Sequence, residues 1–357
     1  MSEKYTSKWS KAELQVKFER GRKAIADGVK FQMGFLQPDG GYIWDGYRCD
    51  AFHKQAYSWN LVGENEAAHR LLNWIRDNRI REDGSLVLVP TAKEKGMTMN
   101  PPQSPDDANI DIYKHCWTIQ GAHRLGRFDV SFPIYNFLKT CQRPCGGFPL
   151  ENSMDHSRAM TTAWAGVTAI YFNDLEMAQK CMDWCLGVQE QNTDPEKYYF
   201  STDDAGKIIT DNGNYIDIHK TKQCYWEVGF SMILANRMYQ ITGDKKYLDA
   251  VGKWLDFLWT CAEDVWSYWG SGKAAQAAAM YYSFTGDERG IDAAVSFIDF
   301  VVETQVKVAD KDGKYAGGLW YDDEPDILLI YVDHAACFSG WVLDSISYIE
   351  SRMGLLK

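Results

Sequence analysis

Basic and imidazole side chains gather at a few short segments of this 357-residue chain, although its formal net charge is −11. Each segment lies at the predicted start of a helix that is rich in small and apolar residues. Helix starts favour anions, because the first turn has unpaired N–H groups and the positive end of the helix dipole. We therefore expect a cavity that binds a small-molecule substrate. The candidate catalytic residues at these helix starts are Lys273, His53, His334 and the acidic Asp50. The candidate substrate-binding residues there are Arg158, Lys222 and His156.

The segment 269–273 reads Trp-Gly-Ser-Gly-Lys and runs into a stretch of alanines. Its glycines expose the backbone at a helix start beside Lys273, which suits a phosphate group. The spacing is shorter than that of a P-loop. The alternative is that the two glycines only let the helix pack closely against its neighbours.

Two acidic clusters are candidate Mg²⁺ sites. Residues 322–326 read Asp-Asp-Glu-Pro-Asp, the spacing with which class I terpene cyclases and prenyl synthases hold magnesium, and 106–111 is one residue longer. Carboxylate oxygens together with a substrate diphosphate suit this ion. However, Pro325 disfavours a helix there, and acidic runs in loops are usually just solvated. The candidate metal ligands are Asp106, Asp107, Asp111, Asp322, Asp323 and Asp326, of which Asp322 and Asp323 are also candidate catalytic residues.

Aromatic residues make up 14% of the chain, and many fall on or beside the predicted buried helices. Their faces can stabilise a carbocation or stack on a sugar ring, and many must simply fill the core. The aromatic candidates for substrate binding are Tyr113, Trp117, Trp226, Trp269 and Trp341.

An internal repeat positions these residues. In each copy a helix ends in an apolar or aromatic stretch, a Gln and a Gly-rich turn follow, and a second helix starts. The clearest copies are 31–44 and 137–148, and weaker ones are 74–86, 184–200, 254–266 and 300–320.

The second helix of each copy is apolar on most sides, which predicts burial all round. These six predicted inner helices span 49–61, 113–125, 156–172, 222–242, 273–285 and 333–349. The intervening helices, such as 66–78, 244–261 and 287–304, carry one apolar stripe opposite charged residues and predict an outer ring. The helix 11–36 is expected to complete that ring against the last inner helix. The predicted fold is all-α, an (α/α)6 toroid of six helical hairpins in a single domain, 1–357.

The composition excludes several classes of protein. The mean hydropathy is −0.39, and no apolar run approaches the roughly 18 residues that span a membrane. The polar N-terminus predicts a cytoplasmic location. The net charge disfavours nucleic acid as a partner. Nine cysteines without a Cys-x-x-Cys pair predict reduced thiols and no structural zinc.

The order aromatic, Leu, Gln, Gly-Gly and aromatic resembles the repeats of squalene and hopene cyclases and of the beta subunits of protein prenyltransferases. Residues 137–170 look most like the prenyltransferase version. The resemblance implies the toroid over nearly the whole chain, a fold that also carries sugar epimerases, glycosidases and polysaccharide lyases. The Asp-x-Asp-Asp acid of squalene-type cyclases is absent, and so is the Asp-x-Cys part of the prenyltransferase zinc site.

Three hypotheses of function follow. The first is a Mg²⁺-dependent terpene cyclase, a lyase that ionises an allylic isoprenoid diphosphate, with diphosphate on Lys273, Lys222 and Arg158. The second is a carbohydrate-active enzyme, a hydrolase, epimerase or lyase of an acidic sugar, with acid and base work by a carboxylate or by His53, His156 or His334. The third is a binding scaffold without activity. We expect the isoprenoid enzyme.

Overall fold

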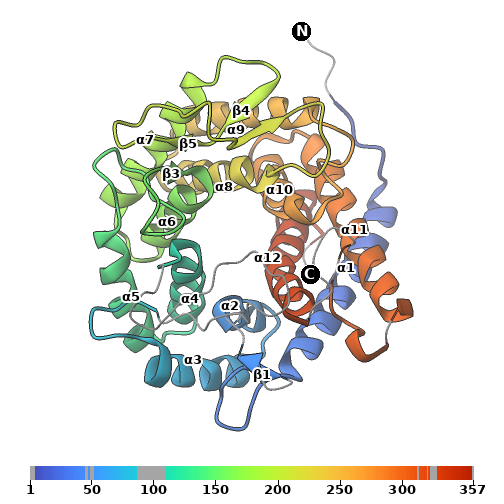
Figure 1. The fold of residues 1–357 in the computed structure, drawn as a ribbon. Helices are drawn as coiled ribbons and strands as arrows, with labels where there is room; N and C mark the ends of the chain where they lie inside the picture. Colours follow the sequence, from blue (N-terminus) through green and yellow to red (C-terminus); the bar gives the residue numbers. More distant parts are fainter. Residues whose placement is uncertain are drawn as a thin grey trace.

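In the computed structural model, the chain is described over residues 5–44, 47–48, 52–86, 110–311, 313–319, 321 and 328–355. Helices dominate these residues, and they alternate along the chain between an outer and an inner ring (Figure 1). The outer helices are α1 (Lys11–Met33), α3 (Asn65–Arg79), α5 (Phe128–Thr140), α7 (Leu175–Gln191), α9 (Lys245–Thr260) and α11 (Arg289–Lys311). The inner helices are α2 (Phe52–Leu61), α4 (Ile112–Arg124), α6 (Ala159–Tyr171), α8 (Tyr225–Thr242), α10 (Gly272–Thr285) and α12 (Leu328–Met353).

The ring closes on itself. Each inner helix packs against the inner helices before and after it, and α12 packs against α2. The N-terminal α1 packs against both α12 and α11, so it completes the outer ring beside the last hairpin. The predicted (α/α)6 toroid is therefore confirmed.

Burial separates the two rings as the sequence pattern requires. In α6 the ten residues from Ala159 to Ala169 except Met160 are buried, because the helix has neighbours on every side. In α9 the buried residues form one stripe, Tyr247, Ala250, Val251, Trp254, Leu255 and Leu258, with the helical spacing of three and four.

The Gln and Gly-Gly of the repeat have a structural explanation. Gly146 adopts a left-handed backbone (φ +90°), and its carbonyl accepts a hydrogen bond of 3.0 Å from Gln142 Nε2. A Cβ atom at Gly146 would lie 2.8 Å from the Lys180 carbonyl oxygen. Gln305 and Gly317 repeat this bond at 3.1 Å in the last hairpin. The motif therefore builds the turn of a hairpin and packs it on the next outer helix.

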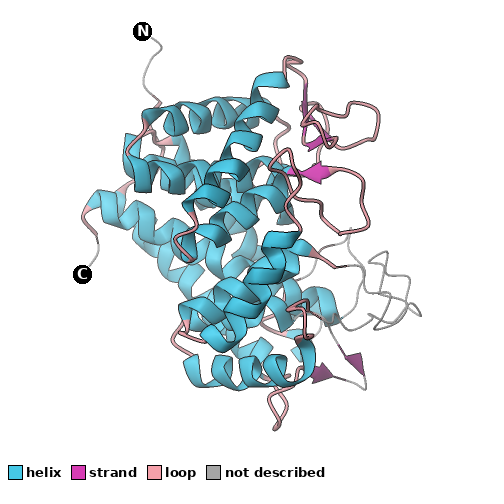
Figure 2. Cartoon of the chain, turned by 90° about the vertical axis from the view of Figure 1, so that its left-hand side faces the viewer, coloured by secondary structure: helices cyan, strands magenta, loops and turns pink. Residues whose placement is uncertain are grey.

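Short strands gather at one end of the ring, the end from which the inner helices start (Figure 2). The described strands form three antiparallel pairs. β1 (Ile43–Trp44) pairs with β2 (Tyr47–Arg48), β3 (Ser157–Arg158) pairs with β5 (Ser201–Thr202), and β4 (Lys197–Tyr199) pairs with β6 (Tyr215–Asp217). Single turns of 3-10 helix, η2 (Trp269–Ser271) and η3 (Gly313–Tyr315), lie before α10 and α12. Strands of two or three residues carry no readable period, so the sequence did not predict them.

Several predicted inner helices have wrong boundaries. The helix predicted at 156–172 starts at Ala159, because β3 takes up the residues before it. The helix predicted at 222–242 starts at Tyr225, and Lys222 before it has a left-handed backbone (φ +58°). For the helix predicted at 49–61, the described residues begin at Phe52. The helix predicted at 333–349 starts earlier, at Leu328, which places Asp333 and His334 in its second turn.

No helix of the described residues is long and apolar enough to cross a membrane. The eight cysteines that the structure describes carry free thiols, as the sequence predicted.

Candidate active site

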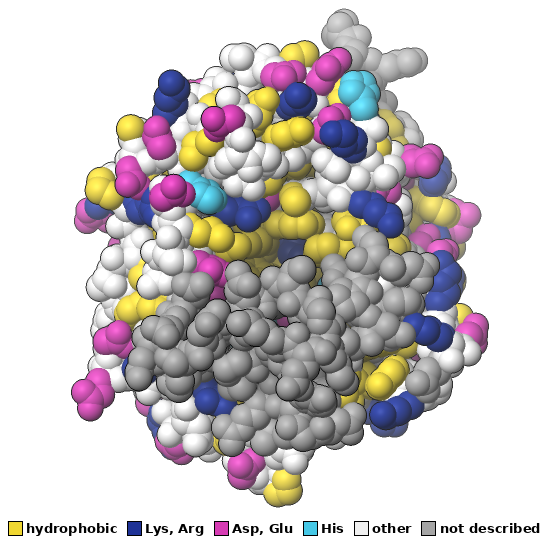
Figure 3. Space-filling view, viewed as in Figure 1, with side chains coloured by type: hydrophobic (Ala, Val, Ile, Leu, Met, Phe, Trp, Pro, Cys, Tyr) yellow, Lys and Arg dark blue, Asp and Glu magenta, His cyan; other side chains and the backbone are white. Residues whose placement is uncertain are grey.

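The middle of the ring is hollowed on the face from which the inner helices start. Figure 3 shows hydrophobic side chains within this hollow, with Lys or Arg side chains in it and around it. We refer to this hollow as the central cavity.

Aromatic rings from four inner helices meet beneath the helix starts. Trp117 of α4 lies 5.0 Å from Trp164 of α6 and 5.4 Å from Trp341 of α12, measured between ring centroids. Phe230 of α8 lies 5.0 Å from Trp164 and 5.8 Å from Trp341. All four rings are buried. Since the four helices surround the middle of the ring, these residues form an apolar floor for the central cavity.

Lys273, at the start of α10, lies against this aromatic floor. Its Nζ atom is 5.5 Å from the ring centroid of Trp341 and 6.0 Å from that of Phe230. Nζ also donates a hydrogen bond of 3.5 Å to Cys337 Sγ, which accepts a second one from Trp341 Nε1 at 3.1 Å. Burial lowers the pKa of Lys273, and the positive charge of Lys54 acts in the same direction.

A carboxylate on α12 binds the basic residues at the start of α2. Asp333 Oδ2 lies 2.7 Å from Lys54 Nζ, and Oδ1 lies 3.9 Å from His53 Nε2. Burial alone would raise the pKa of Asp333, but Lys54, His53 and His334 outweigh burial and hold that pKa well below its usual value. Asp333 is therefore an ionised carboxylate that lies beside His53 and directly precedes His334 in α12.

His334 packs against aromatic rings. It stacks on Trp269 and on Phe338, with ring centroids 5.5 Å apart in each case. Trp269 in turn stacks on Trp226 at 5.0 Å. On the other side, His53 packs edge-on to Tyr113 at 6.4 Å, and Tyr113 packs on Trp117. Thus His53 belongs to the ring contacts that include Tyr113, Trp117 and Trp341, and His334 belongs to a second group with Trp269 and Trp226.

Arg158 has a partner that the sequence did not indicate. It forms an ion pair with Glu227 of α8, which is fully buried. The other oxygen of Glu227 accepts a hydrogen bond of 2.7 Å from the Met160 N–H in the first turn of α6. Glu227 therefore neutralises Arg158 and caps α6.

Two predicted binding residues lie away from these two groups. His156 contacts Asp155 at 2.9 Å and Asn214 at 3.4 Å in the loops before α6 and α8. Lys222 is exposed, and its backbone N–H donates to Asp264 at 2.6 Å.

The glycines of the segment 269–273 are explained by packing. A Cβ atom at Gly270 would lie 2.6 Å from Trp226, and one at Gly272 would lie 2.6 Å from Phe297 and 2.8 Å from Trp341. These distances are too short for any side chain, so the alternative of close helix packing accounts for both glycines.

The predicted metal ligands are tested only in part. Asp111 is the N-cap of α4, where it accepts from the Lys114 N–H at 3.1 Å, and its Oδ2 lies 3.6 Å from Lys114 Nζ. In the part of the chain that the structure describes, no group of three His, Cys, Asp or Glu side chains is placed to hold a metal ion. Magnesium binding stays a prediction. Asp50, Asp106, Asp107, Asp322, Asp323 and Asp326 lie outside the described residues.

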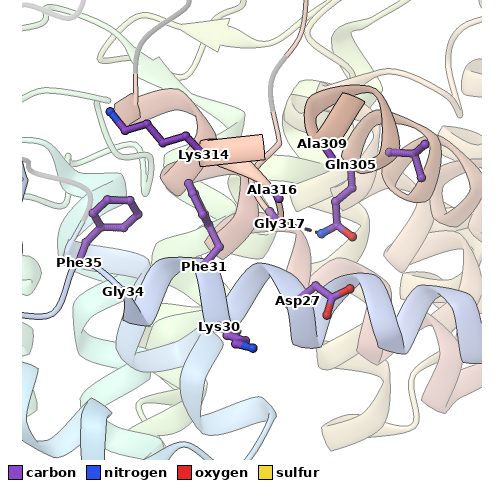
Figure 4. Close-up of a pocket in the computed structure, with 11 residues that line it drawn as sticks. Asp27, Lys30, Phe31, Gly34, Phe35, Gln305, Ala309, Lys314, Ala316 and Gly317 are labelled. Atoms are coloured by element: carbon purple, nitrogen blue, oxygen red, sulfur yellow. Dashed lines mark hydrogen bonds between the residues drawn. The ribbon is translucent and has the colours of Figure 1, made fainter. Parts of the chain in front are cut away.

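A second cavity lies outside the ring, between the end of α1, α11 and the turn at η3 (Figure 4). It has a volume of about 610 Å³ and contains Lys30, Lys314 and the hydrogen bond from Gln305 to Gly317. None of the predicted site residues lines it.

No family model matches the chain, and no curated protein matches it. Solved structures do match over nearly the full length. A cellobiose 2-epimerase from Spirochaeta thermophila has a TM-score of 0.68 at 12% identity, over 97% of this chain and 100% of its own. A D-mannose isomerase has a TM-score of 0.63 at 14% identity, over 96% and 99%. A glycoside hydrolase family 76 α-mannanase from Bacteroides thetaiotaomicron has a TM-score of 0.63 at 14% identity, over 93% and 98%.

These similarities establish the fold and correct the predicted function. The neighbours are sugar-active proteins, so the prediction of a terpene cyclase, a lyase of isoprenoid diphosphates, is wrong. The repeat that suggested it encodes the hairpin turn described above. The resemblance to the terpenoid cyclases holds for the toroid alone.

Proposed function

We propose that the protein is a carbohydrate-active enzyme that epimerises or isomerises a reducing sugar at the carbon next to its carbonyl group. The observation that carries the proposal is the pair of buried histidines on the adjacent inner helices α2 and α12. His53 lies 3.9 Å from the ionised Asp333, and His334 follows Asp333 in α12. The names of two structural neighbours, a D-mannose isomerase and a cellobiose 2-epimerase, support the same class of reaction.

Epimerisation requires one group to remove a proton from C2 of the open-chain sugar and another to deliver a proton to the opposite face of C2. Isomerisation begins in the same way and places the proton on C1. Histidine suits both roles, because its ordinary pKa lies close to neutral pH. We assign these roles to His53 and His334. The cation of Lys54 stabilises negative charge that develops on the sugar oxygens in the transition state. Tyr113, which is partly exposed at the start of α4, offers an aromatic ring against which a sugar can pack.

Proton transfer fits the described carboxylates better than glycoside hydrolysis does. A glycosidase needs a pair of carboxyl groups, one of them protonated to act as the acid. Asp333 is ionised beside Lys54, and Glu227 forms an ion pair with Arg158. Asp203 and Asp204, which are neighbours in the chain, lie in a turn, and Asp204 forms an ion pair of 2.6 Å with Arg143. The ion pairs also remove the reason to require an acidic sugar, since they neutralise most of the cations that suggested one.

Proton exchange at C2 tests the proposal directly. The purified protein is incubated in D2O with D-mannose, D-glucose or cellobiose, and proton NMR follows both the C2–H signal and the appearance of new sugars. We expect deuterium at C2 and an intact glycosidic bond in cellobiose. His53→Asn and His334→Asn should each slow the exchange by about 10²- to 10⁴-fold.

The exposed His219→Asn, on the loop before α8, is the matched control and should exchange like the wild type. Release of monosaccharide from mannan oligosaccharides without C2 exchange would instead identify a hydrolase. Exchange that survives in both site variants would reject the assigned histidines.

A further inference from the structure

Lys273 differs from the other buried lysines of the inner ring in what its Nζ atom contacts. Lys54 and Lys114 each have a carboxylate oxygen within 4.0 Å, from Asp333 and Asp111. Among the described residues, Lys273 Nζ has no carboxylate within that distance, and its hydrogen-bond partner is the Cys337 thiol. A buried ammonium without a carboxylate in contact is costly, so burial shifts Lys273 toward the neutral amine.

The contacts of Lys273 suit a neutral amine that keeps its lone pair. The amine donates one N–H to Cys337 Sγ, and that sulfur already accepts the Trp341 indole N–H. An amine that donates in this way still has its lone pair available for another atom. The side chain is 5% exposed and lies on the aromatic floor, where water competes little for the nitrogen.

We propose that Lys273 is a nucleophile that forms an imine with the carbonyl carbon of the open-chain sugar. This inference rests on the proposed function and adds a covalent step to it. The Lys273 nitrogen attacks the carbonyl carbon, a C–N bond forms, and the carbonyl oxygen takes up the proton that the nitrogen releases. The C–O bond of this carbinolamine then breaks, and water leaves as the C=N bond forms.

The imine makes the following proton transfer easier. Its protonated nitrogen withdraws electrons from C2 more strongly than the carbonyl oxygen does, so the C2 proton is removed more readily. His53 or His334 takes this proton and leaves an enamine, and a proton returned to C2 regenerates the imine. Water then adds to the C=N bond, and the C–N bond breaks to release the sugar and the free amine. The sequence consumes no oxidant, reductant or other co-reactant.

Reductive trapping tests the inference on the unmodified enzyme. The protein is incubated with D-mannose and sodium cyanoborohydride, which reduces an imine to a stable secondary amine, and peptide mass mapping locates the adduct. We expect the mass of one sugar plus two hydrogens minus one water on Lys273, and none on Lys54. Mannitol, which has no carbonyl group but the same hydroxyls, should slow labelling at Lys273 and leave exposed lysines such as Lys180 unaffected.

Two variants separate the imine from a purely electrostatic role of Lys273. Lys273→Arg keeps a cation but cannot form an imine, and Lys273→Met removes both the charge and the nucleophile. We expect both variants to lose C2 exchange by at least about 10²-fold while circular dichroism shows an intact fold. Lys180→Met, on the outer α7, is the control for surface labelling.

The outcomes distinguish this inference from the proposed function. C2 exchange in the wild type without an adduct, together with an active Lys273→Arg, would overturn the imine and leave the epimerase intact. An adduct at Lys273 without exchange on any sugar would support the nucleophile and reject the epimerase. Labelling of Lys273 no faster than that of exposed lysines, with no effect of mannitol, would overturn the inference even if the variants failed to fold.

Discussion

Asp333 forms an ion pair with Lys54, which lies 279 positions away in the chain, and this contact organises the candidate site. Lys54 and His53 lie at the start of α2, in the first complete hairpin, and Asp333 lies in the last helix. The sequence identified His53 and His334 as candidates from their residue type at predicted helix starts. It could not pair Lys54 and His53 with Asp333, because these contacts exist only when α12 closes the ring against α2.

Replacing Asp333 tests the ion pair. In Asp333→Asn, Lys54 and His53 stay buried without their counter-charge, and we expect the free energy of unfolding to fall by about 2 to 4 kcal/mol. The folded pKa of Asp333 lies below its ordinary value of 3.8, so the contribution of Asp333 to stability is complete above that pH and is lost as the pH falls further. Urea unfolding should therefore show a gap between wild type and variant that narrows only below about pH 4. A gap that closes between pH 7 and pH 5 would contradict the ion pair as its source.

The Lys54→Met variant provides a comparison within the same pair. It removes the cation and leaves Asp333 facing His53 and His334 alone, so the pKa of Asp333 should rise. The stability of Lys54→Met should therefore begin to fall at a higher pH than the stability of the wild type does. The same pH profile in Lys54→Met and in the wild type would show that Lys54 does not set the charge of Asp333.

His115 connects two elements, the end of the α3 hairpin and the start of α4. Its Nε2 accepts a hydrogen bond of 2.9 Å from the Leu86 N–H, and Nδ1 lies 2.7 Å from the Asp111 carbonyl oxygen. This arrangement needs the neutral ring, with the proton on Nδ1. Burial lowers the pKa of His115 to about 4. His115 is thus a structural histidine, in contrast to His53 and His334.

The stability that depends on neutral His115 is complete above its unfolded pKa of 6.5 and is lost as the pH falls from there toward 4. That change corresponds to about 3 kcal/mol in the free energy of unfolding. Denaturant unfolding near pH 7.5 and near pH 5 should show about 2 kcal/mol of this change, because the remainder is lost only below pH 5. We expect a clearly smaller difference in His115→Gln, whereas an equal difference in variant and wild type would assign the pH dependence to other groups.

The hairpin turns explain why the sequence predicted the architecture well and the function wrongly. The Gln and Gly-Gly pattern is visible because Gly146 and Gly317 need left-handed backbones next to a neighbouring helix, and only glycine meets both demands. The same demand arises in any toroid of this kind, whatever the cavity binds. The pattern therefore indicates how the helices pack, and it was wrong to infer isoprenoid chemistry from it.

Alanine at two left-handed glycines separates backbone strain from close packing. Gly146 has φ +90° and the Lys180 carbonyl oxygen 2.8 Å from an added Cβ, whereas Gly213 has φ +77° and nothing within 4 Å. Gly213→Ala should cost about 1 kcal/mol from backbone strain alone. Gly146→Ala should cost about 2 to 4 kcal/mol, because α7 must also move away. Equal losses in thermal or urea unfolding would show that α5 and α7 tolerate separation at this turn.

The molecule as a whole depends on the packing of its first helix against its last. Phe18 of α1 is fully buried, and a Cβ atom at Gly21 would lie 3.0 Å from Ile298 of α11 and 3.3 Å from Val342 of α12. Arg22 of α1 also binds Glu350 of α12 at 2.5 Å. The aromatic floor takes one ring from α12, and Asp333 comes from the same helix. The candidate site is thus formed only when both ends of the described chain are in place.

Weakening this closure should therefore destabilise the cavity together with the outer ring. We expect Phe18→Ala to lower the free energy of unfolding by about 3 to 5 kcal/mol, and Val16→Ala, at a residue of the same helix that is 58% exposed, to change it little. Unfolding followed by tryptophan fluorescence, which includes the floor residues Trp117, Trp164 and Trp341, should have the same midpoint as unfolding followed by far-ultraviolet circular dichroism. In Phe18→Ala both midpoints should shift together, because the inner helices lose their neighbours when the ring opens. Two separated transitions would instead show that part of the toroid folds without closure, and the prediction of a single domain would then be wrong.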